Sequence, residues 1–408
     1  MKKLFLSLLV LASTQLFAAT KMETVEVDGF ERNYWVVSPT APVAKTHPVV
    51  MVLHGVGGTA EDYLKLFDAQ TLSDLHDALF VFPQALPEQD AENLKAVDNM
   101  KKLGVMPDGL ELKNPWGAGA RISAATIKEM AGDAAALLNF VIPTIMKKGY
   151  GELNETVDDV KFLNTVISNL KSSFAASDDI YMAGASMGGA MVYKYAYSKN
   201  SQTTKICAFN GFVGAGVDTT AKAINIPALI FNSKGDQLVQ YEGGMFNGPV
   251  EETVKTIAAQ NGCGAATSKP CEDLKADGNT VTEITYGCDD DKLVKCFISS
   301  TAAHTQVLNS LENDIDFFWE MEKFFFGNGN AGNENIVAQP LRFFPNPVED
   351  KLYCEESGDC VVTDLTGRVV LSAEVVDGVA DLSDLSAGYY IFTLKTANET
   401  LRARIVKK

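Results

Sequence analysis

One pentapeptide, Gly184-Ala185-Ser186-Met187-Gly188, constrains the fold of this chain more than any other feature. It lies between an apolar run at 180–183 and a helix-like run at 190–196. A serine flanked by small residues at such a junction projects its hydroxyl from a sharp turn between a strand and a helix. The pattern predicts that Ser186 is a nucleophile and that the backbone N–H of Met187 points toward a developing oxyanion. The alternative is an ordinary turn between a strand and a helix.

The order of the other candidate residues along the chain fits this interpretation. In α/β hydrolases the nucleophile comes first, then the acid, then the histidine. Of the four histidines only His304 follows Ser186, so His304 is the candidate base. Asp236 ends a turn after the short apolar run 227–231 and is the candidate acid, which would hold the imidazole in one tautomer. Asp218 and the acidic run 289–291 remain rivals for that role.

A glycine-rich loop, His54-Gly55-Val56-Gly57-Gly58, follows the strand-like run 48–53. Its glycines allow the backbone to approach a substrate closely. We expect the backbone N–H of Val56 to be the second oxyanion donor. The loop lacks a Gly-Lys-Ser/Thr ending and a Gly-x-Gly-x-x-Gly pattern, which argues against a nucleotide site. No cofactor is predicted.

Several motifs taken together resemble a known family. They are Leu53-His54-Gly55-Val56-Gly57-Gly58-Thr59, Val157-Asp158-Asp159-Val160-Lys161-Phe162-Leu163, Gly184-Ala185-Ser186-Met187-Gly188-Gly189, Gly235-Asp236 with the segment 239–244, and Asn261-Gly262-Cys263. Residues 25–325 resemble the secreted esterases grouped as polyhydroxybutyrate depolymerase-like or feruloyl esterase, carbohydrate esterase family 1. The resemblance implies an α/β-hydrolase fold and a triad of Ser186, Asp236 and His304 that acts on carboxylic esters.

The motifs also suggest substrate-binding residues. We expect His54, Gly55 and Tyr241 to lie at the substrate site. Trp116 follows a long polar stretch within residues 84–156, and it either lines the substrate cleft or anchors this long segment. We include it among the substrate-binding candidates, because loops at the carboxyl ends of strands carry binding sites in open α/β sheets.

One departure from the family concerns the acyl pocket. Such enzymes usually follow the catalytic histidine with a segment containing Trp-Pro, whereas this chain continues Thr305-Gln306-Val307. The resemblance favours feruloyl or acetyl esters on xylan as substrates, with polyhydroxyalkanoate depolymerase as the alternative. A non-catalytic surface protein that binds polysaccharide is the alternative of another class.

The N-terminus and the net charge indicate export. Residues 1–18 combine a charged start, a short apolar core and a small-residue cleavage site, as in a signal peptide. No later apolar run approaches the ~18 residues that a transmembrane helix needs. The net charge of −17 is typical of a solvated extracellular surface and offers no basic stripe for nucleic acid. We expect a secreted or cell-surface monomer that is exported through the periplasm.

The chain changes character after its predicted esterase domain, residues 19–327. Residues 328–338 are rich in Gly and Asn and predict a flexible linker. Residues 339–408 show short alternating strands and resemble the C-terminal sorting domain of the type IX secretion system. The motifs are Phe344-Pro345-Asn346-Pro347-Val348, Asp364-Leu365-Thr366-Gly367-Arg368, Ala387-Gly388-Tyr389-Tyr390 and the basic end Lys407-Lys408. This resemblance implies a small β-sandwich and the type IX secretion machinery as partner; a carbohydrate-binding sandwich is the alternative.

Seven cysteines suit an oxidising compartment. Cys207 lies in an apolar run, and we expect a free core thiol. Four further cysteines precede His304 and permit three pairings, among which the sequence does not choose; they are Cys263, Cys271, Cys288 and Cys296. Their spacing lacks a Cys-x-x-Cys pair, so no zinc or other metal site is predicted. We expect Cys354 and Cys360 to pair across a hairpin.

Strand-like and helix-like segments alternate through the first three hundred residues. Strands are predicted near 24–37, 48–53, 78–83, 179–183, 205–210 and 227–232, and helices at about 60–67, 125–148, 157–173 and 187–198. Such alternation predicts an α/β fold with a mostly parallel sheet and helices on both faces. Apolar residues at helical spacing in 306–325 predict a closing helix whose aromatic side chains pack in the core.

Overall fold

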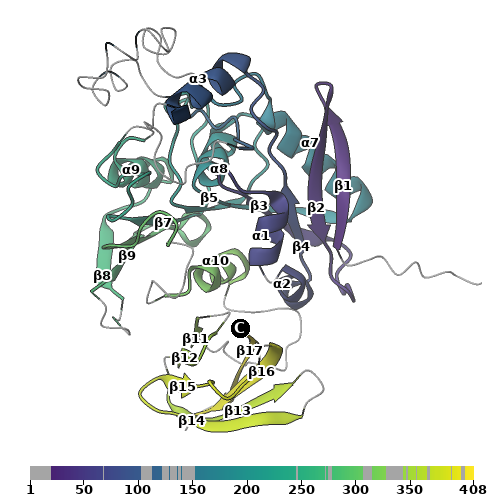
Figure 1. The fold of residues 1–408 in the computed structure, drawn as a ribbon, viewed down its shortest axis with the longest axis vertical. Coiled ribbons are helices and arrows are strands. Elements are labelled where there is room, and N and C mark those ends of the chain that lie inside the picture. The colour runs from purple at the N-terminus through teal and green to yellow at the C-terminus, as the bar shows by residue number, and fades with distance from the viewer. Residues whose placement is uncertain are drawn as a thin grey trace, which may run out of the picture.

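The structure is a computed structural model (Figure 1). It describes residues 20–67, 69–102, 113–121, 128, 136, 139, 152–244, 247–271, 273, 278–306, 315–327, 343–345, 348–354, 356–364, 368–386, 388–396 and 400–408. The predicted signal peptide (1–18), the predicted linker (328–338) and nearly all of the helix expected at 125–148 lie outside the described residues.

A ten-stranded sheet is the framework of the first part of the chain. In spatial order its strands are β1 (Thr20–Val27), β2 (Phe30–Val37), β4 (Leu79–Pro83), β3 (His47–Leu53), β5 (Ala176–Ala185), β6 (Lys205–Phe209), β7 (Ala228–Ser233), β10 (Val294–Ser299), β9 (Val281–Tyr286) and β8 (Ala266–Pro270). The six central strands from β4 to β10 run parallel, and the pairs at both edges are antiparallel. This arrangement confirms the predicted α/β-hydrolase fold.

The N-terminal strand expected at 24–37 is in fact a hairpin. β1 and β2 pair antiparallel around Asp28 and Gly29, which have φ angles of 53° and 83°. A two-residue turn with positive φ at both positions matches the right-handed twist of paired strands, and Asp-Gly is a favoured sequence for it. The dipeptide Asp28-Gly29 is therefore the sequence signal for a turn that divides residues 24–37 into two strands.

Helices cover both faces of the sheet (Figure 1). One face is covered by α7 (Asp159–Ser173), α8 (Met187–Tyr197) and α9 (Val250–Gln260), and the other by α1 (Ala60–Leu66), α2 (Ala69–His76) and α10 (Phe317–Phe326). The long segment after β4 contains α3 (Ala91–Lys102), and the 3₁₀ turn η2 (Asp290–Lys292) precedes β10.

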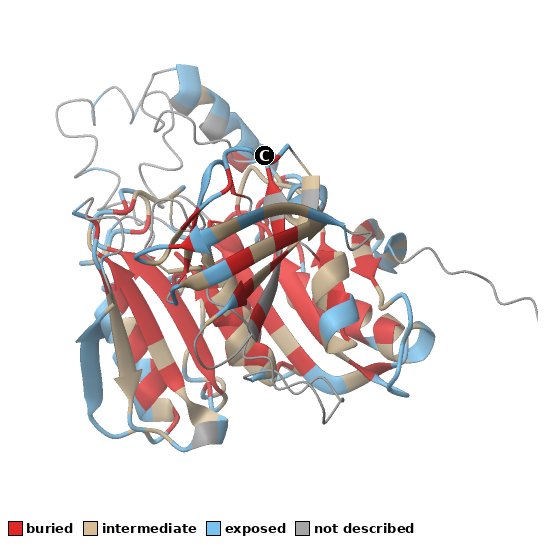
Figure 2. Ribbon diagram, turned by 90° about the horizontal axis from the view of Figure 1, so that it is seen from below, coloured by how far each residue is buried: buried red, intermediate tan, exposed pale blue. Residues whose placement is uncertain are grey.

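The central strands are buried on both faces, and Figure 2 shows the buried residues concentrated in them. Along β3, Met51 and Leu53 belong to the core under α8, whereas Val50 and Val52 belong to the core under α10. Side chains alternate between the two faces of a strand, so a strand buried on both sides is apolar throughout. The continuous apolar run at 48–53 reflects this double burial.

The described part of the predicted closing helix is α10. α10 starts at Phe317, where Asp316 caps it by accepting hydrogen bonds from the backbone N–H groups of Phe318 and Trp319 at 2.9 and 3.1 Å; residues 307–314 lie outside the described part. Phe317 and Phe325 are buried, and the ring centroid of Phe317 lies 4.6 Å from that of Phe231 in β7. The predicted packing role of these aromatic residues is confirmed.

The C-terminal part of the chain consists of two small antiparallel sheets. One contains β11 (Phe343–Phe344), β12 (Lys351–Cys354) and β15 (Val379–Asp381); the other contains β14 (Val369–Val375), β13 (Gly358–Asp364), β16 (Gly388–Lys395) and β17 (Thr400–Lys407). Buried residues of both sheets, such as Leu352 and Phe392, share one core that is separate from the cores of the large sheet. This is the predicted all-β sandwich.

Within the described residues the cysteines form one disulfide, and the other five are free thiols. Cys207 is a buried free thiol, as predicted. The prediction that Cys354 and Cys360 pair across a hairpin is wrong, because both are buried free thiols. Cys354 ends β12 and Cys360 lies in β13, and these strands belong to different sheets rather than to one hairpin.

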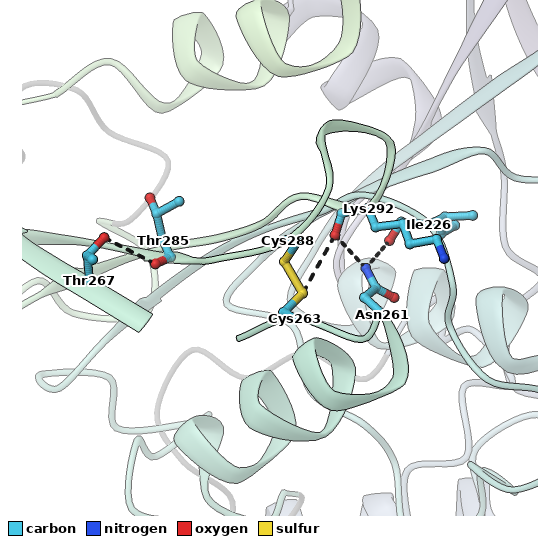
Figure 3. Close-up of a disulfide and its surroundings, with 7 residues drawn as sticks. All are labelled: Ile226, Asn261, Cys263, Thr267, Thr285, Cys288 and Lys292. Atoms are coloured by element: carbon cyan, nitrogen blue, oxygen red, sulfur yellow. Dashed lines mark hydrogen bonds between the residues drawn. A yellow bond between two sulfur atoms is a disulfide. The ribbon is translucent and has the colours of Figure 1, made fainter. Parts of the chain in front are cut away.

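Cys263 pairs with Cys288 (Figure 3). Cys271 and Cys296 are free thiols. The disulfide joins the turn after α9 to the segment between β9 and β10. Beside it, the Asn261 side chain donates hydrogen bonds to the backbone carbonyls of Ile226 and Lys292 at 2.8 and 2.9 Å. The disulfide and this amide together fix the end of α9 against the start of β10, the strand that precedes His304.

Candidate active site

Ser186 lies on the tight turn between β5 and α8. Its backbone adopts φ 54° and ψ −120°, a conformation that non-glycine residues rarely adopt. Its backbone N–H donates a hydrogen bond to the carbonyl of Phe209 at the end of β6, at 2.8 Å. Such strain persists only where the surroundings impose it, and it clusters at functional sites.

The glycines of the pentapeptide allow this turn to pack closely. A Cβ at Gly188 would lie 2.2 Å from the carbonyl oxygen of Leu53, and one at Gly184 would lie 2.5 Å from the backbone of Gly188. These distances are far below van der Waals contact, so neither position accepts a side chain without moving the backbone. The small residues that the sequence pattern required are therefore needed for packing the turn against β3.

Three loops bring the predicted triad together. Ser186 follows β5, Asp236 follows β7 and His304 follows β10. His304 Nε2 lies 2.9 Å from Ser186 Oγ, and His304 Nδ1 lies 2.7 Å from Asp236 Oδ2. These contacts favour the Nδ1–H tautomer, in which Nε2 is free to accept the serine proton.

The Asp236 carboxylate is buried and accepts hydrogen bonds from the protein. Only 4% of the residue is exposed. Its Oδ1 accepts the backbone N–H groups of Leu238 and Val239, each at 2.8 Å, which leaves Oδ2 for His304. The rival acid Asp218 is instead exposed and accepts the hydroxyl and backbone N–H of Thr220.

Two asparagines that the sequence analysis missed fix the loop that carries His304. The Asn210 side chain donates to the His304 carbonyl at 3.1 Å. The side-chain oxygen of Asn279 accepts from the Ser299 hydroxyl at 2.6 Å and from the Thr301 backbone N–H at 3.2 Å. Both asparagines lie outside any catalytic motif, so only the folded chain shows their partners.

The loops of the acid and the histidine also touch each other directly. A Cβ at Gly235 would lie 2.1 Å from the carbonyl oxygen of Thr301. Glycine at this position therefore allows the backbone before Asp236 to approach the backbone before His304.

The hydrogen bonds of the loop 54–58 and of the serine turn bear on the two predicted oxyanion donors. In the loop 54–58, Gly55 N–H donates to the Tyr63 hydroxyl at 3.1 Å and Gly57 N–H to the Lys113 carbonyl at 2.7 Å. Considering only the residues that the structure describes, the N–H groups of Val56 and Met187 donate no hydrogen bond. Both N–H groups are therefore without a protein acceptor in the described part of the chain, and their role as oxyanion donors stays a prediction.

His54 does not present its side chain to a substrate, which corrects that prediction. The ring is fully buried; its Nδ1 lies 2.8 Å from the Gly55 carbonyl and its Nε2 accepts the Ala85 backbone N–H at 3.2 Å. Burial lowers the pKa of His54 from 6.5 to about 4. The ring is thus neutral. It supports the loop 54–58, which we call the oxyanion loop after its predicted role, from the buried side.

Trp116 is also buried, so it anchors the long segment instead of lining a cleft. None of its surface is exposed, and its Nε1–H donates to the His54 carbonyl at 2.8 Å. The next residue, Gly117, donates its backbone N–H to Asp159 at 2.7 Å, and Asp159 forms a fully buried ion pair with Arg32. Of the two roles considered for Trp116, the structure supports the anchoring one.

Gly55 and Tyr241 are the other two predicted substrate contacts. A Cβ at Gly55 would lie 3.5 Å from Ser186 Cβ, so Gly55 borders the nucleophile. Tyr241 is half-buried, with the Lys234 ammonium 5.5 Å from its ring centroid and its carbonyl accepting the Val250 N–H at 2.9 Å. A role of Tyr241 in substrate binding stays a prediction.

The described part of the chain contains no helix long and apolar enough to span a bilayer. Within the same residues there is no group of three or more His, Cys, Asp or Glu side chains that could hold a metal ion.

Comparison with known proteins identifies the C-terminal part. The family model of the secretion system C-terminal sorting domain matches residues 342–408. No curated protein sequence matches the chain.

Solved structures similar to this chain include several hydrolases. An acetyl xylan esterase from Aspergillus awamori is 14% identical, with a TM-score of 0.44, over 75% of this chain and 99% of the other. A CE1 ferulic acid esterase from Anaeromyces mucronatus is 14% identical, with a TM-score of 0.35, over 60% and 79%. A poly(3-hydroxybutyrate) depolymerase from Bordetella parapertussis is 17% identical, with a TM-score of 0.33, over 57% and 74%. Likenesses this distant carry no argument about the reaction or the substrate.

The match to the sorting domain agrees with the β-sandwich and with the sequence motifs of this region. Residues 342–408 of this chain therefore belong to the secretion-system C-terminal sorting domains, which direct a protein through type IX secretion to the cell surface or the extracellular space.

Proposed function

We propose that this chain is a serine esterase that hydrolyses carboxylic esters outside the cell. The observation that carries the proposal is the continuous hydrogen-bonded series from Ser186 through His304 to Asp236, at 2.9 and 2.7 Å. A nucleophile within reach of a base, and the base oriented by a third group, is the arrangement that activates a serine hydroxyl.

The reaction follows from the positions of these atoms. Ser186 Oγ attacks the ester carbonyl while His304 Nε2 takes its proton, and Asp236 stabilises the imidazolium that forms. The N–H groups of Val56 and Met187 bind the oxyanion, and each such donor is worth roughly 2.7–4 kcal/mol in the transition state. His304 then protonates the departing alcohol, and water attacks the acyl-enzyme by the same route in reverse.

For the substrate we propose esters on plant cell-wall polysaccharide, with feruloyl or acetyl groups on xylan first. The sequence motifs around the loop 54–58 and around Ser186 support this choice. Polyhydroxyalkanoate is the alternative polymer. A surface protein that only binds polysaccharide is less consistent with the site, because such a protein needs neither the strained Ser186 backbone nor a buried, doubly bonded Asp236.

The domain limits belong to the same proposal. Residues 1–18 are the signal peptide, 19–327 the esterase domain, 328–338 the linker and 339–408 the sorting domain. Each residue of the triad comes from one chain, and we propose that the enzyme acts as a monomer.

A labelling experiment tests this function. We expect an esterase-directed fluorophosphonate to label the wild type at Ser186 and not to label Ser186→Ala, which should also lose ester hydrolysis. Ser168→Ala is the matched control, because Ser168 lies on the exposed side of α7 and its hydroxyl donates to the Asn164 carbonyl of the same helix at 2.9 Å. Parallel assays on methyl ferulate, an acetylated xylo-oligosaccharide and a hydroxybutyrate oligomer then choose the substrate. Labelling at another serine, or full activity in Ser186→Ala, would overturn the proposal.

A further inference from the structure

The Tyr63 side chain reaches the oxyanion loop from α1, the helix that follows this loop. Its hydroxyl oxygen accepts the Gly55 backbone N–H at 3.1 Å. The ring packs beside His54, with centroids 6.3 Å apart, and beside Phe67, with centroids 6.5 Å apart. Gly55 is the residue before Val56, so the hydroxyl lies next to the peptide group that carries the proposed oxyanion donor.

The same hydroxyl lies close to the nucleophile. A Cβ placed on Gly55 would lie 3.5 Å from Tyr63 Oη and also 3.5 Å from Ser186 Cβ. The hydroxyl and the nucleophile therefore border one small space above Gly55, and their separation is at most twice that distance. The carbonyl group of an ester attacked by Ser186 must lie next to this space above Gly55.

The proton of this hydroxyl is available for a ligand. The oxygen already accepts the Gly55 N–H, so its own O–H must point elsewhere. Across the described ranges, the Tyr63 hydroxyl donates no hydrogen bond. Burial raises the pKa of Tyr63 to about 12, so the hydroxyl keeps its proton at neutral pH. The O–H can therefore donate a hydrogen bond to an oxygen of a bound substrate.

We infer that the Tyr63 hydroxyl is a third hydrogen-bond donor to the carbonyl-derived oxygen of the ester, beside the N–H groups of Val56 and Met187. This inference rests on the proposed function. Its Gly55 bond holds the phenol in place before substrate arrives, and a donor fixed in advance costs no reorganisation during the reaction. Tyr63 would thus be a catalytic residue rather than a packing residue of α1.

The test compares Tyr63→Phe with the wild type on a p-nitrophenyl ester and on the matching thionoester. Sulfur accepts hydrogen bonds poorly, so a donor to the oxyanion accelerates the ester much more than the thionoester. We expect Tyr63→Phe to lower kcat/KM for the ester by roughly 10²-fold, mainly through kcat, and to change the thionoester rate far less. The ratio of the two rates should fall.

Tyr195→Phe is the matched control. The Tyr195 hydroxyl also accepts a backbone N–H, that of Gln202 at 3.2 Å, but it donates its proton to Asn164 at 2.8 Å on α7. This variant should leave both rates unchanged, and thermal unfolding of both variants reports any loss of fold.

Three outcomes would overturn the inference. A folded Tyr63→Phe with the wild-type ester rate would show that the hydroxyl does not contact the oxyanion. An equal fall in the ester and thionoester rates would show that Tyr63 only supports the loop. A wild type that neither hydrolyses esters nor reacts with fluorophosphonate would overturn the proposed function and this inference with it.

Discussion

The indole N–H of Trp116 donates a hydrogen bond to the backbone carbonyl of His54, at 2.8 Å. This single contact ties the long segment after β4 to the loop that carries the proposed oxyanion donor Val56. The same carbonyl oxygen of His54 would lie 2.6 Å from a Cβ at Gly188, so the contact sits directly behind the serine turn. A buried side chain can thus position the backbone of the proposed active site.

Trp116→Phe tests this positioning role. The variant keeps an aromatic ring and removes the N–H donor, which leaves the buried His54 carbonyl without its partner. We expect a fall in kcat of about tenfold with KM little changed, and a loss of stability of about 1–3 kcal/mol. Steady-state kinetics and urea unfolding measure the two effects.

Trp319→Phe is the control for that variant. The Trp319 Nε1 is buried and has no hydrogen-bond partner within the described residues, so its loss removes ring volume but no bond. Equal effects of the two substitutions on kcat would show that the Trp116 N–H has no positioning role.

The coupling within the triad gives a second prediction. We expect His304→Ala to lower kcat by several orders of magnitude and Asp236→Asn by somewhat less. Residues that act as a unit are not additive, so the double variant should lose little more than His304→Ala alone. Asp218→Asn is the control, since that carboxylate is exposed and accepts the hydroxyl and backbone N–H of Thr220. Additive losses would mean that Asp236 does not act through His304.

The disulfide gives a third prediction. Cys263 and Cys288 are 25 residues apart, and a cross-link of that span should stabilise the fold by about 3.5 kcal/mol through the unfolded chain. Replacing both by alanine should lower the free energy of unfolding by about that amount and leave kcat nearly unchanged. Urea unfolding measures the loss, and peptide mapping without reduction should find Cys271 and Cys296 as free thiols. A peptide that joins Cys271 to Cys296 would contradict the pairing described here.

The burial of His54 predicts how stability depends on pH. Burial lowers its pKa to about 4, whereas the unfolded chain titrates near 6.5. Between pH 6.5 and 4, His54 is protonated in the unfolded chain but neutral in the folded chain. The contribution of His54 to the free energy of unfolding is therefore lost as the pH falls toward 4. His54 alone should add up to about 1.4 kcal/mol per pH unit to that decline.

The non-titrating variant His54→Asn isolates this effect. Its free energy of unfolding should fall less steeply than that of the wild type between pH 6.5 and 4.5. Asp316 works in the opposite direction, because burial raises its pKa to about 6, but it is present in both proteins and cancels in the comparison. Parallel slopes for the two proteins would show that the His54 ring is not held neutral.

A fifth prediction concerns the sorting domain. α10 completes the core under the large sheet, and its C-terminal carbonyls at Phe324 and Phe325 accept hydrogen bonds from Lys205 at 3.0 and 2.8 Å. A chain that ends at Gly327 keeps these contacts, so we expect it to fold and to hydrolyse small soluble esters at close to the full-length rate. In its native host the same truncation should accumulate in the periplasm. Loss of activity on a soluble ester would mean that the C-terminal sandwich completes the active site.

Much of the candidate site could be predicted from the sequence because its signals are local. The turn at Ser186 needs small neighbours within two residues, and the order of nucleophile, acid and histidine follows from the order of the strands. Likewise the apolar runs of the parallel strands reflect burial on both faces of the sheet. These features depend on spacing along the chain, and spacing is what a sequence records.

The roles of His54 and Trp116 were decided only by the tertiary structure. Both belong to segments that suggest a substrate cleft. Whether a side chain points into the cleft or behind it depends on partners distant in sequence: the Ala85 backbone N–H for His54, and the His54 carbonyl for Trp116. The choice of Cys288 as the partner of Cys263, and the supports that Asn210 and Asn279 give to the histidine loop, have the same origin. The sequence therefore determined which residues are suited to the chemistry, and the packing of distant segments determined which of them face the reacting atoms and which hold those atoms in place.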